Sequence, residues 1–201
     1  RTASFGKNWG YYVGMDEIYR YYVNMHEERR KAQLDAYCAA HPDVENIPAN
    51  YGYGSMSMHV VNTPIIKIAG DGKTARTMWY STGQDTTYQE SDSAEAMWYT
   101  YRVCADCIFE EGEWRIWHMF VSNDVFFPAG KMYDCPTIIP EGTLPDEIEF
   151  DEPTIKVLAH DNTFNNADGY PPMPEDYYSF CDELSYGPEG HPKLNKGGMY
   201  I

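Results

Sequence analysis

The residue of this chain best suited to chemistry is a histidine set among apolar neighbours. His59 lies within residues 57–62, between Met58 and Val60. An imidazole exchanges protons near neutral pH, so His59 can serve as a general acid or as a general base. From the residues alone it can equally be a core histidine whose hydrogen bonds are satisfied, and both interpretations stay open at this point.

Cys104 and Cys107 have the Cys-x-x-Cys spacing of many metal sites, but they lie in a stretch that is predicted to be a strand. Side chains three apart on a strand point to opposite faces, so these thiols cannot hold one ion without a bulge. The chain has no second Cys-x-x-Cys, and its six histidines are scattered. We therefore expect no metal and no cofactor. Asp106, between the cysteines, needs a partner if it is buried, and Arg102 or Arg115 is the expected one.

Residues 55–127 read as four consecutive β-strands that position these side chains. The expected strands cover residues 57–68, 74–81, 94–109 and 114–126. Asp71-Gly72 predicts a type I′ hairpin turn between the first two strands, and residues 110–113 predict a turn between the last two. A long antiparallel meander of this kind can form a reaction chamber around His59.

The chain before these strands predicts an extended segment and one long helix. Residues 1–13 are expected to be extended and to end at Gly14. Residues 15–40 repeat apolar side chains near helical spacing and begin with carboxylates, which the positive end of a helix dipole favours. Pro42 ends the helix, because the residue before a proline is disfavoured in the helical conformation.

Residues 128–201 differ in composition from the rest of the chain, since they hold ten of the thirteen prolines and show no sustained hydrophobic periodicity. Such a segment rarely builds a core of its own. It nevertheless keeps many apolar side chains. We therefore expect an extended arm that packs on residues 1–127 or on a neighbouring subunit, with one short helix near residues 175–184. An arm that one domain can hardly bury predicts a homo-oligomer.

The composition argues against several classes of partner. The chain has 15 Lys and Arg against 31 Asp and Glu, a net charge of −16. Nucleic acids and anionic membrane surfaces are therefore not expected partners, and no apolar run approaches the roughly 20 residues that cross a bilayer. Five irregularly spaced cysteines are typical of reduced thiols in a cytoplasmic protein. Aromatic residues make up 15% of the chain, which indicates an aromatic core or a pocket for a flat, hydrophobic, oxygenated ligand.

A helix followed by a long antiparallel sheet whose last turn is Gly-x-Trp resembles the SnoaL-like group of the NTF2-like superfamily. Within that superfamily it is most similar to the bile acid 7α-dehydratase and scytalone dehydratase families. The resemblance covers about residues 5–127 and is carried by Gly10, Tyr11, Tyr12, Val13, Gly14, Ser57, Met58, His59, Thr63, Pro64, Thr74, Ala75, Trp79, Tyr80, Gly112, Glu113 and Trp114. It implies an α+β cone, in which a curved antiparallel sheet and helices enclose a pocket, followed here by the C-terminal arm. It also implies that the domain of residues 1–127 lacks the family's first helices, which supply a catalytic tyrosine and aspartate.

Residue by residue, the resemblance places His59 where those dehydratases keep a pocket histidine. Their carboxylate after the second strand aligns near Gly83, so Asp85 is its nearest substitute and the second candidate catalytic residue. Their last-strand arginine aligns with Asn123, and a second histidine aligns near Trp98. The residues expected to contact a substrate are Trp79, Tyr80, Trp98, His118 and Asn123. Plainer interpretations also stay open, with Asp85 as a solvated loop acid and His118 as a structural histidine.

Two functions of different classes remain. The first is a cofactor-independent lyase, a dehydratase, or an isomerase that applies the acid/base chemistry of His59 to a hydrophobic hydroxylated or keto substrate, steroid-like or polyketide-like. The second is a non-catalytic NTF2-like module for ligand binding or assembly, which the loss of most matched polar residues favours. In either case we expect a homo-oligomer, a trimer by resemblance or else a dimer, with the arm at the interface.

Overall fold

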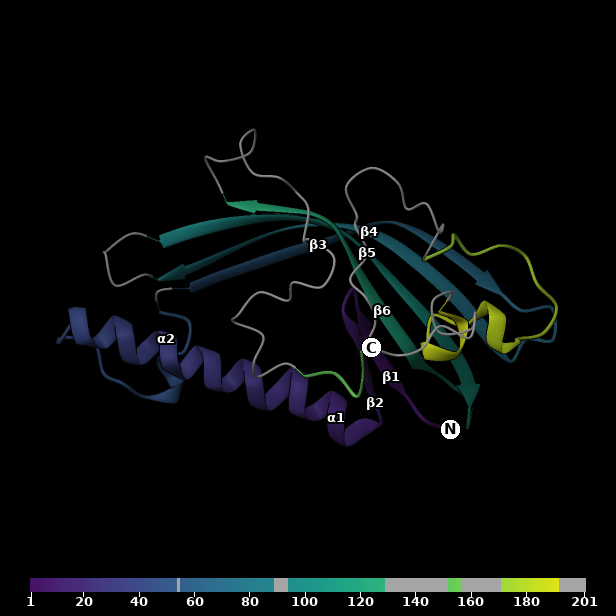
Figure 1. The fold of residues 1–201 in the computed structure, drawn as a ribbon, viewed down its shortest axis with the longest axis horizontal. Coiled ribbons are helices and arrows are strands. Elements are labelled where there is room, and N and C mark those ends of the chain that lie inside the picture. The colour runs from purple at the N-terminus through teal and green to yellow at the C-terminus, as the bar shows by residue number, and fades with distance from the viewer. Residues whose placement is uncertain (54, 89–93, 129–151, 157–170, 192–201) are drawn as a thin grey trace.

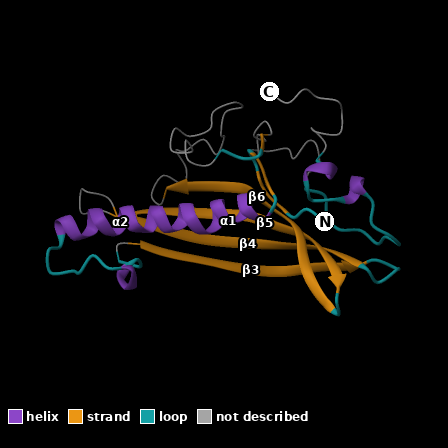
Figure 2. Cartoon of the chain, turned by 90° about the horizontal axis from the view of Figure 1, so that it is seen from below, coloured by secondary structure: helices purple, strands orange, loops and turns teal. Residues whose placement is uncertain are grey.

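The computed structural model describes residues 1–53, 55–88, 94–128, 152–156 and 171–191. Within these residues the chain forms a curved seven-stranded sheet in the order β3-β4-β5-β6-β1-β2-β7. A long helix lies along one face of the sheet (Figures 1 and 2). This is the α+β architecture that the sequence predicts.

Four long antiparallel strands make up most of the sheet. They are β3 (Ser55–Ile68), β4 (Thr74–Tyr88), β5 (Ala94–Glu110) and β6 (Glu113–Pro128). The sequence predicts all four, but it ends the second at residue 81, whereas β4 continues to Tyr88, so Asp85 lies on a strand and not in a loop. The turn from β5 to β6 has positive φ at Glu111 and Gly112, as a type I′ turn requires. In the turn from β3 to β4 only Gly72 has positive φ, so the type I′ turn expected at Asp71-Gly72 is wrong.

The remaining strands make the sheet mixed rather than wholly antiparallel. β1 (Ser4–Lys7) and β2 (Gly10–Val13) form a hairpin. β1 runs parallel to β6, with Phe5 beside Met119. β7 (Ile155–Lys156) pairs with β2 at the far edge. A segment late in the chain therefore extends the sheet on the side away from β3.

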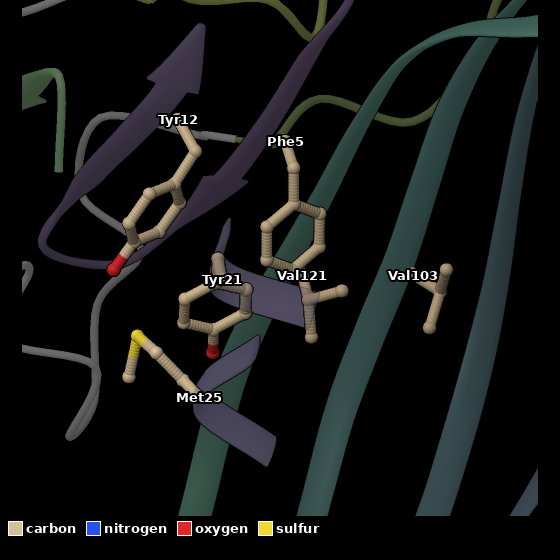
Figure 3. Packing of buried hydrophobic residues seen from close by; sticks show 6 residues of the cluster. All are labelled: Phe5, Tyr12, Tyr21, Met25, Val103 and Val121. Carbon is tan, nitrogen blue, oxygen red and sulfur yellow. The ribbon is translucent and has the colours of Figure 1, made fainter. Parts of the chain in front are cut away.

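The predicted helix of residues 15–40 is present, and it contains an irregular stretch that the sequence does not announce. α1 (Met15–Tyr19) continues into the π-helical segment η1 (Arg20–Met25) and then into α2 (His26–Ala40), which ends before Pro42. Two residues of η1 enter the apolar cluster shown in Figure 3, which consists of Phe5, Tyr12, Tyr21, Met25, Val103 and Val121. We call the sheet face that carries this cluster and the helix the inner face.

The opposite, outer face of the sheet is covered at one end by residues 171–191. Tyr186 is fully buried and packs in a cluster with Met78, Cys104 and Phe120. Its hydroxyl donates a hydrogen bond to the carbonyl of Pro172 at 2.6 Å. The short helix expected near residues 175–184 is reduced to a 3-10 turn. Within the described ranges the 3-10 turns are η2 (Pro48–Asn50), η4 (Asp182–Leu184) and η5 (Pro188–Gly190).

Asp106 is buried on the outer face, but the partners expected for it are wrong. Arg76, its direct neighbour across β4 and β5, has its Nε 3.6 Å from Asp106 Oδ1. Arg102 pairs instead with Asp124 at 2.7 Å, and Arg115 pairs with a glutamate of the β5–β6 turn. The pairing follows the strand register, which the sequence alone does not supply.

The predicted arm, residues 128–201, lies largely outside the described residues, so its boundaries and its place at a subunit interface stay predictions. Its described parts, residues 152–156 and 171–191, contact the sheet of the same chain. None of the helices in the described part of the chain is long and apolar enough to cross a bilayer.

Candidate active site

His59 and Asp85, the two predicted catalytic residues, are in contact on the inner face. His59 Nε2 lies 2.9 Å from Asp85 Oδ1. The two side chains are 33% and 32% exposed, so this histidine is not buried in the core. Because an ionised carboxylate only accepts hydrogen bonds, Nε2 carries the hydrogen and donates it to Asp85. The other ring nitrogen, Nδ1, is then the atom left to exchange a proton with a ligand.

The strands β3 and β4 bring the two side chains together along a diagonal. His59 lies opposite Gly83, and Asp85 lies two residues farther along β4, opposite Ser57. Residues two apart on a strand share a face, and diagonal neighbours are within reach of long side chains. A Cβ at position 83 would stand 2.0 Å from His59 Nδ1. The imidazole therefore occupies the space that the glycine leaves open.

Two tyrosines of β5 flank the His59 ring, and a third, on η1, interacts electrostatically with one of them. The ring centroids of Tyr101 and Tyr99, both on β5, lie 5.6 and 6.0 Å from that of His59. Tyr22 belongs to the π-helical segment η1, and its pKa is raised to about 12, first by burial and then by Tyr101. π-Helical turns occur frequently at functional sites. Here the Tyr22 ring, carried by such a turn, packs against Phe5 of the inner cluster, with 4.7 Å between the ring centroids.

The phenol of Tyr99 is also held in its neutral form. Burial is the main reason that the pKa of Tyr99 is raised, and the Asp85 carboxylate raises it further, whereas Arg29 lowers it. A neutral phenol can donate a hydrogen bond to an oxygen atom of a ligand. The inner face therefore offers one proton-exchanging pair and hydrogen-bond donors beside it.

Two further predicted site residues share the inner face. Trp79, on β4, is half-buried and packs against the cluster of Figure 3. Asn123 lies opposite Tyr101 in the register of β5 and β6. The side chain of Asn8 fixes the backbone of Asn123. Asn8 Oδ1 accepts a hydrogen bond from the N–H of Asn123 at 3.0 Å, and Asn8 Nδ2 donates one to the carbonyl of Asn123 at 3.1 Å. Asn123 is thus held in place three strands from His59.

Tyr80 and Trp98 lie on the outer face, away from His59. Neighbouring residues on a strand point to opposite faces, so Tyr80 faces outward where Trp79 faces inward, and Trp98 faces outward beside Tyr99. Both outward side chains are 44% exposed. The structure does not bring them together with the predicted catalytic pair.

His118 also faces outward, and its surroundings are those of a structural histidine. It is 3% exposed, and its Nδ1 lies 2.7 Å from the hydroxyl oxygen of Ser4. Burial lowers the pKa of His118 to about 4, so the ring is neutral at pH 7. This hydrogen bond ties β1 to β6 rather than placing the imidazole beside His59.

The sequence reasoning did not include Tyr22, Tyr99 and Tyr101 among the site residues. The alternation along β5 signals that Tyr99 and Tyr101 share a face, but only the register shows that this face also carries His59. For Tyr22 the position depends on the π-helical turn, which has no sequence signal that we recognise.

The cysteine motif does not form a joint site. Cys104 is buried and Cys107 half-buried on opposite faces of β5, and burial raises the pKa of both thiols. Among the residues that the structure describes, no three His, Cys, Asp or Glu side chains gather closely enough to hold a metal ion.

Comparison with known proteins locates this site within a family domain. The model of the SnoaL-like domain matches residues 2–119, more than half of the chain. No curated protein matches the sequence.

Two solved structures are similar to the chain over part of its length. For a type 2 hexachlorocyclohexane dehydrochlorinase (LinA), the identity is 9% over 40% of this chain and 51% of that one, with a TM-score of 0.33. For a protein of unknown function from Mycobacterium tuberculosis, the identity is 16% over 61% and 54%, with a TM-score of 0.32. The chain therefore spans about half the length of the structures that it matches.

Proposed function

The chain belongs to the SnoaL-like domain family of the NTF2-like superfamily, and from this premise we propose that it is a cofactor-independent lyase or isomerase. In this proposal His59 is the acid/base, and Asp85 orients it. The substrate is a hydrophobic compound that carries a hydroxyl or keto group, steroid-like or polyketide-like. The observation that carries the proposal is the contact of 2.9 Å between His59 Nε2 and Asp85 Oδ1 on a face lined with tyrosines.

The chemistry requires one group that can take a proton and return it. In a dehydration, His59 Nδ1 removes a proton from carbon, the electron pair of that C–H bond forms the C=C bond, and the C–O bond breaks. The imidazolium then gives its proton to the departing hydroxyl, which leaves as water. In an isomerisation the same proton returns to a different carbon. Neither sequence changes an oxidation state overall, so neither needs an oxidant or a reductant.

The surrounding groups support this chemistry by electrostatics. The Asp85 carboxylate faces Nε2 and stabilises the imidazolium that forms when Nδ1 takes a proton. The neutral phenol of Tyr99 can donate a hydrogen bond to the keto or hydroxyl oxygen, where negative charge develops. Trp79, on the same face, adds apolar surface beside them.

Hydrogen exchange tests the proposal without knowledge of the natural substrate. The protein is incubated in heavy water with a panel of hydrophobic ketones and β-hydroxy ketones, and mass spectrometry follows both deuterium uptake at carbon and loss of water. We expect the wild-type protein to catalyse at least one of these changes. The variant His59→Gln should be roughly 100- to 10,000-fold slower, the usual share of a general acid/base.

The matched control is His41→Gln, which makes the same substitution at a half-buried histidine that stacks on Tyr37 at the end of α2. It should exchange at the wild-type rate. Equal rates for His59→Gln and the wild type would contradict the proposal. Panel compounds that bind without exchange or elimination would favour the non-catalytic binding module instead.

We also propose that the protein is a homo-oligomer with residues 128–201 at the interface, a trimer by resemblance or else a dimer. The support is the apolar content of that segment. A cytoplasmic location is likewise a proposal. It rests on five irregularly spaced cysteines, of which four are free in the described residues.

A further inference from the structure

We infer that Gly83 is a positioning residue of this site, because the absence of a side chain there lets the His59 imidazole cross β4 and reach Asp85. The inference rests on the proposed function for its catalytic meaning. Its structural content can be tested separately. This content is that the imidazole packs against the backbone of Gly83, a contact that we call the seat.

The space above Gly83 is filled by the histidine ring. A Cβ built on Gly83 would lie 2.0 Å from Nδ1, 2.5 Å from Cε1 and 2.9 Å from Cγ of His59. All three distances are shorter than any that real Cβ atoms show. No side chain can therefore be added at position 83 unless the imidazole moves.

The contact with Asp85 depends on that seat. His59 is directly opposite Gly83, while Asp85 is opposite Ser57. To reach Asp85, the ring must lie over β4 at the level of position 83 and extend along the strand. With any other residue at position 83, a side chain would stand between the base and its carboxylate.

Two tyrosines block the movement of the ring toward β5 if position 83 gains a side chain. Tyr99 and Tyr101 flank it on the β5 side, at centroid distances of 6.0 and 5.6 Å. β3 is the edge strand of the sheet among the described residues, so movement outward over β3 leads to solvent. A displaced imidazole moves away from Asp85, and its Nε2–H then donates to water.

The backbone of Gly83 does not itself require glycine. It lies in a regular stretch of β4, between Thr82 and Gln84, and is not among the glycines with positive φ. Alanine fits that backbone conformation, so Gly83→Ala reports on the volume above the residue. Gly52 offers a matched control, because a Cβ there meets no atom within 4 Å and its φ is not in the left-handed region.

Nitrogen NMR of the histidine ring tests the inference. In the wild-type protein the Nε2–H of His59 should show the shifts and slow exchange with water of a hydrogen bond to a carboxylate. The variant Gly83→Ala should lose this signature, as Asp85→Asn does, while Gly52→Ala keeps it. A folded Gly83→Ala variant that keeps the wild-type signature would overturn the inference.

A double-mutant cycle covers the case in which Gly83→Ala is poorly folded. In the background His59→Ala the ring is gone, so the alanine at position 83 has room. We expect Gly83→Ala to lower the melting temperature of the wild-type protein by several degrees and to leave that of His59→Ala nearly unchanged. An equal drop in both backgrounds would show that the glycine serves something other than the imidazole.

The two readouts also separate this inference from the proposed function. If the NMR signature and the cycle behave as expected but the wild-type protein exchanges no hydrogen in the panel, the seat stands and the catalytic proposal falls. If exchange depends on His59 but not on Gly83, the catalytic proposal stands and Gly83 is not a positioning residue for the reaction. When both hold, Gly83→Ala should slow exchange as much as Asp85→Asn does.

Discussion

Replacing Asp106 with asparagine should change how the free energy of unfolding depends on pH. The side chain is 1% exposed. Its Oδ2 accepts hydrogen bonds from the backbone N–H of Tyr186 at 2.6 Å and from the hydroxyl of Ser185 at 3.1 Å. Its Oδ1 has no hydrogen-bond partner among the described residues and lies 3.6 Å from Nε of Arg76. Burial raises the pKa of Asp106 to about 7, although these neighbours favour the ionised form.

The magnitude follows from the difference between the folded and unfolded states. The carboxyl has a pKa of 3.8 when it is unperturbed and about 7 in the folded protein, so the folded state holds the proton more tightly. This contribution to stability is complete below about pH 4 and is lost as the pH rises to about 7. Each tenfold change in proton affinity is about 1.4 kcal/mol, which sets an upper limit of about 4 kcal/mol. Relaxation around a buried charge reduces such penalties, so we expect about 2 to 4 kcal/mol.

His118 acts in the opposite direction from the neighbouring strand. It is the direct partner of Asp106 in the register of β5 and β6. Its folded pKa is lowered from 6.5 to about 4, so its contribution is present above pH 6.5 and is lost as the pH falls toward 4. By the same conversion this is at most about 3 kcal/mol. In the wild-type protein the two effects largely cancel between about pH 4 and 6.5.

Urea unfolding between about pH 4 and 8 separates the two groups. Relative to the wild type, Asp106→Asn should become more stable as the pH rises, and His118→Gln should become less stable. Taking each variant relative to the wild type removes the contribution of the other carboxylates and of the net charge. Curves for Asp106→Asn and the wild type that run parallel over the whole range would refute the reasoning from burial.

Three further predictions concern the C-terminal segment and the assembly. Tyr186→Ala should lower the free energy of unfolding by about 3–5 kcal/mol because it empties a buried site. Tyr186→Phe, which removes the hydroxyl that bonds the carbonyl of Pro172, should cost about 1 kcal/mol. Urea unfolding measures both, and equal losses would contradict the packing. Light scattering should show a homo-oligomer, and a monomer at micromolar concentration would rule out the proposed interface. Limited proteolysis should release no independently folded fragment from residues 128–201, because we predict that they form an arm and not a second domain.

The sequence predicts the strands and the long helix well because their signals are local. Hydrophobic runs and turns mark β3 to β6, and proline marks the end of the helix. The pairing of β1 with its parallel neighbour in the sheet has no such local signal. β1 pairs with β6 more than a hundred residues away, where Ser4 meets His118. No periodicity within either segment predicts that they run parallel.

The faces of the strands explain why the predicted site residues do not all lie beside His59. Trp79 and Tyr80 are adjacent on β4, so period-two alternation alone forbids them from sharing one face. Trp98 and Tyr99 are likewise adjacent on β5, so their side chains point to opposite faces. The resemblance supplied positions but not faces, and it therefore named Tyr80 and Trp98 where the structure places Tyr99 beside His59.

The partner of Asp106 was missed for a related reason. Arg76 lies thirty residues earlier in the chain, and only the register of β4 and β5 places the two opposite one another. The expected partners were closer in sequence to Asp106. Proximity in sequence is a poor guide on a sheet, because the nearest side chain on the same face usually belongs to another strand.

The candidate site and the stabilising core lie at different positions along the strands of the same sheet. Met78 and Val103 are buried in the outer and inner clusters, 1% and 9% exposed. Farther along the sheet, the side chains of His59 and Asp85 are about one-third exposed. Both side chains are polar and keep a third of their surface in water, so they bury little apolar area, and substitution of His59 or Asp85 should change the proposed chemistry more than stability. Substitution of Tyr186 should do the reverse, which makes stability and turnover separable in this protein.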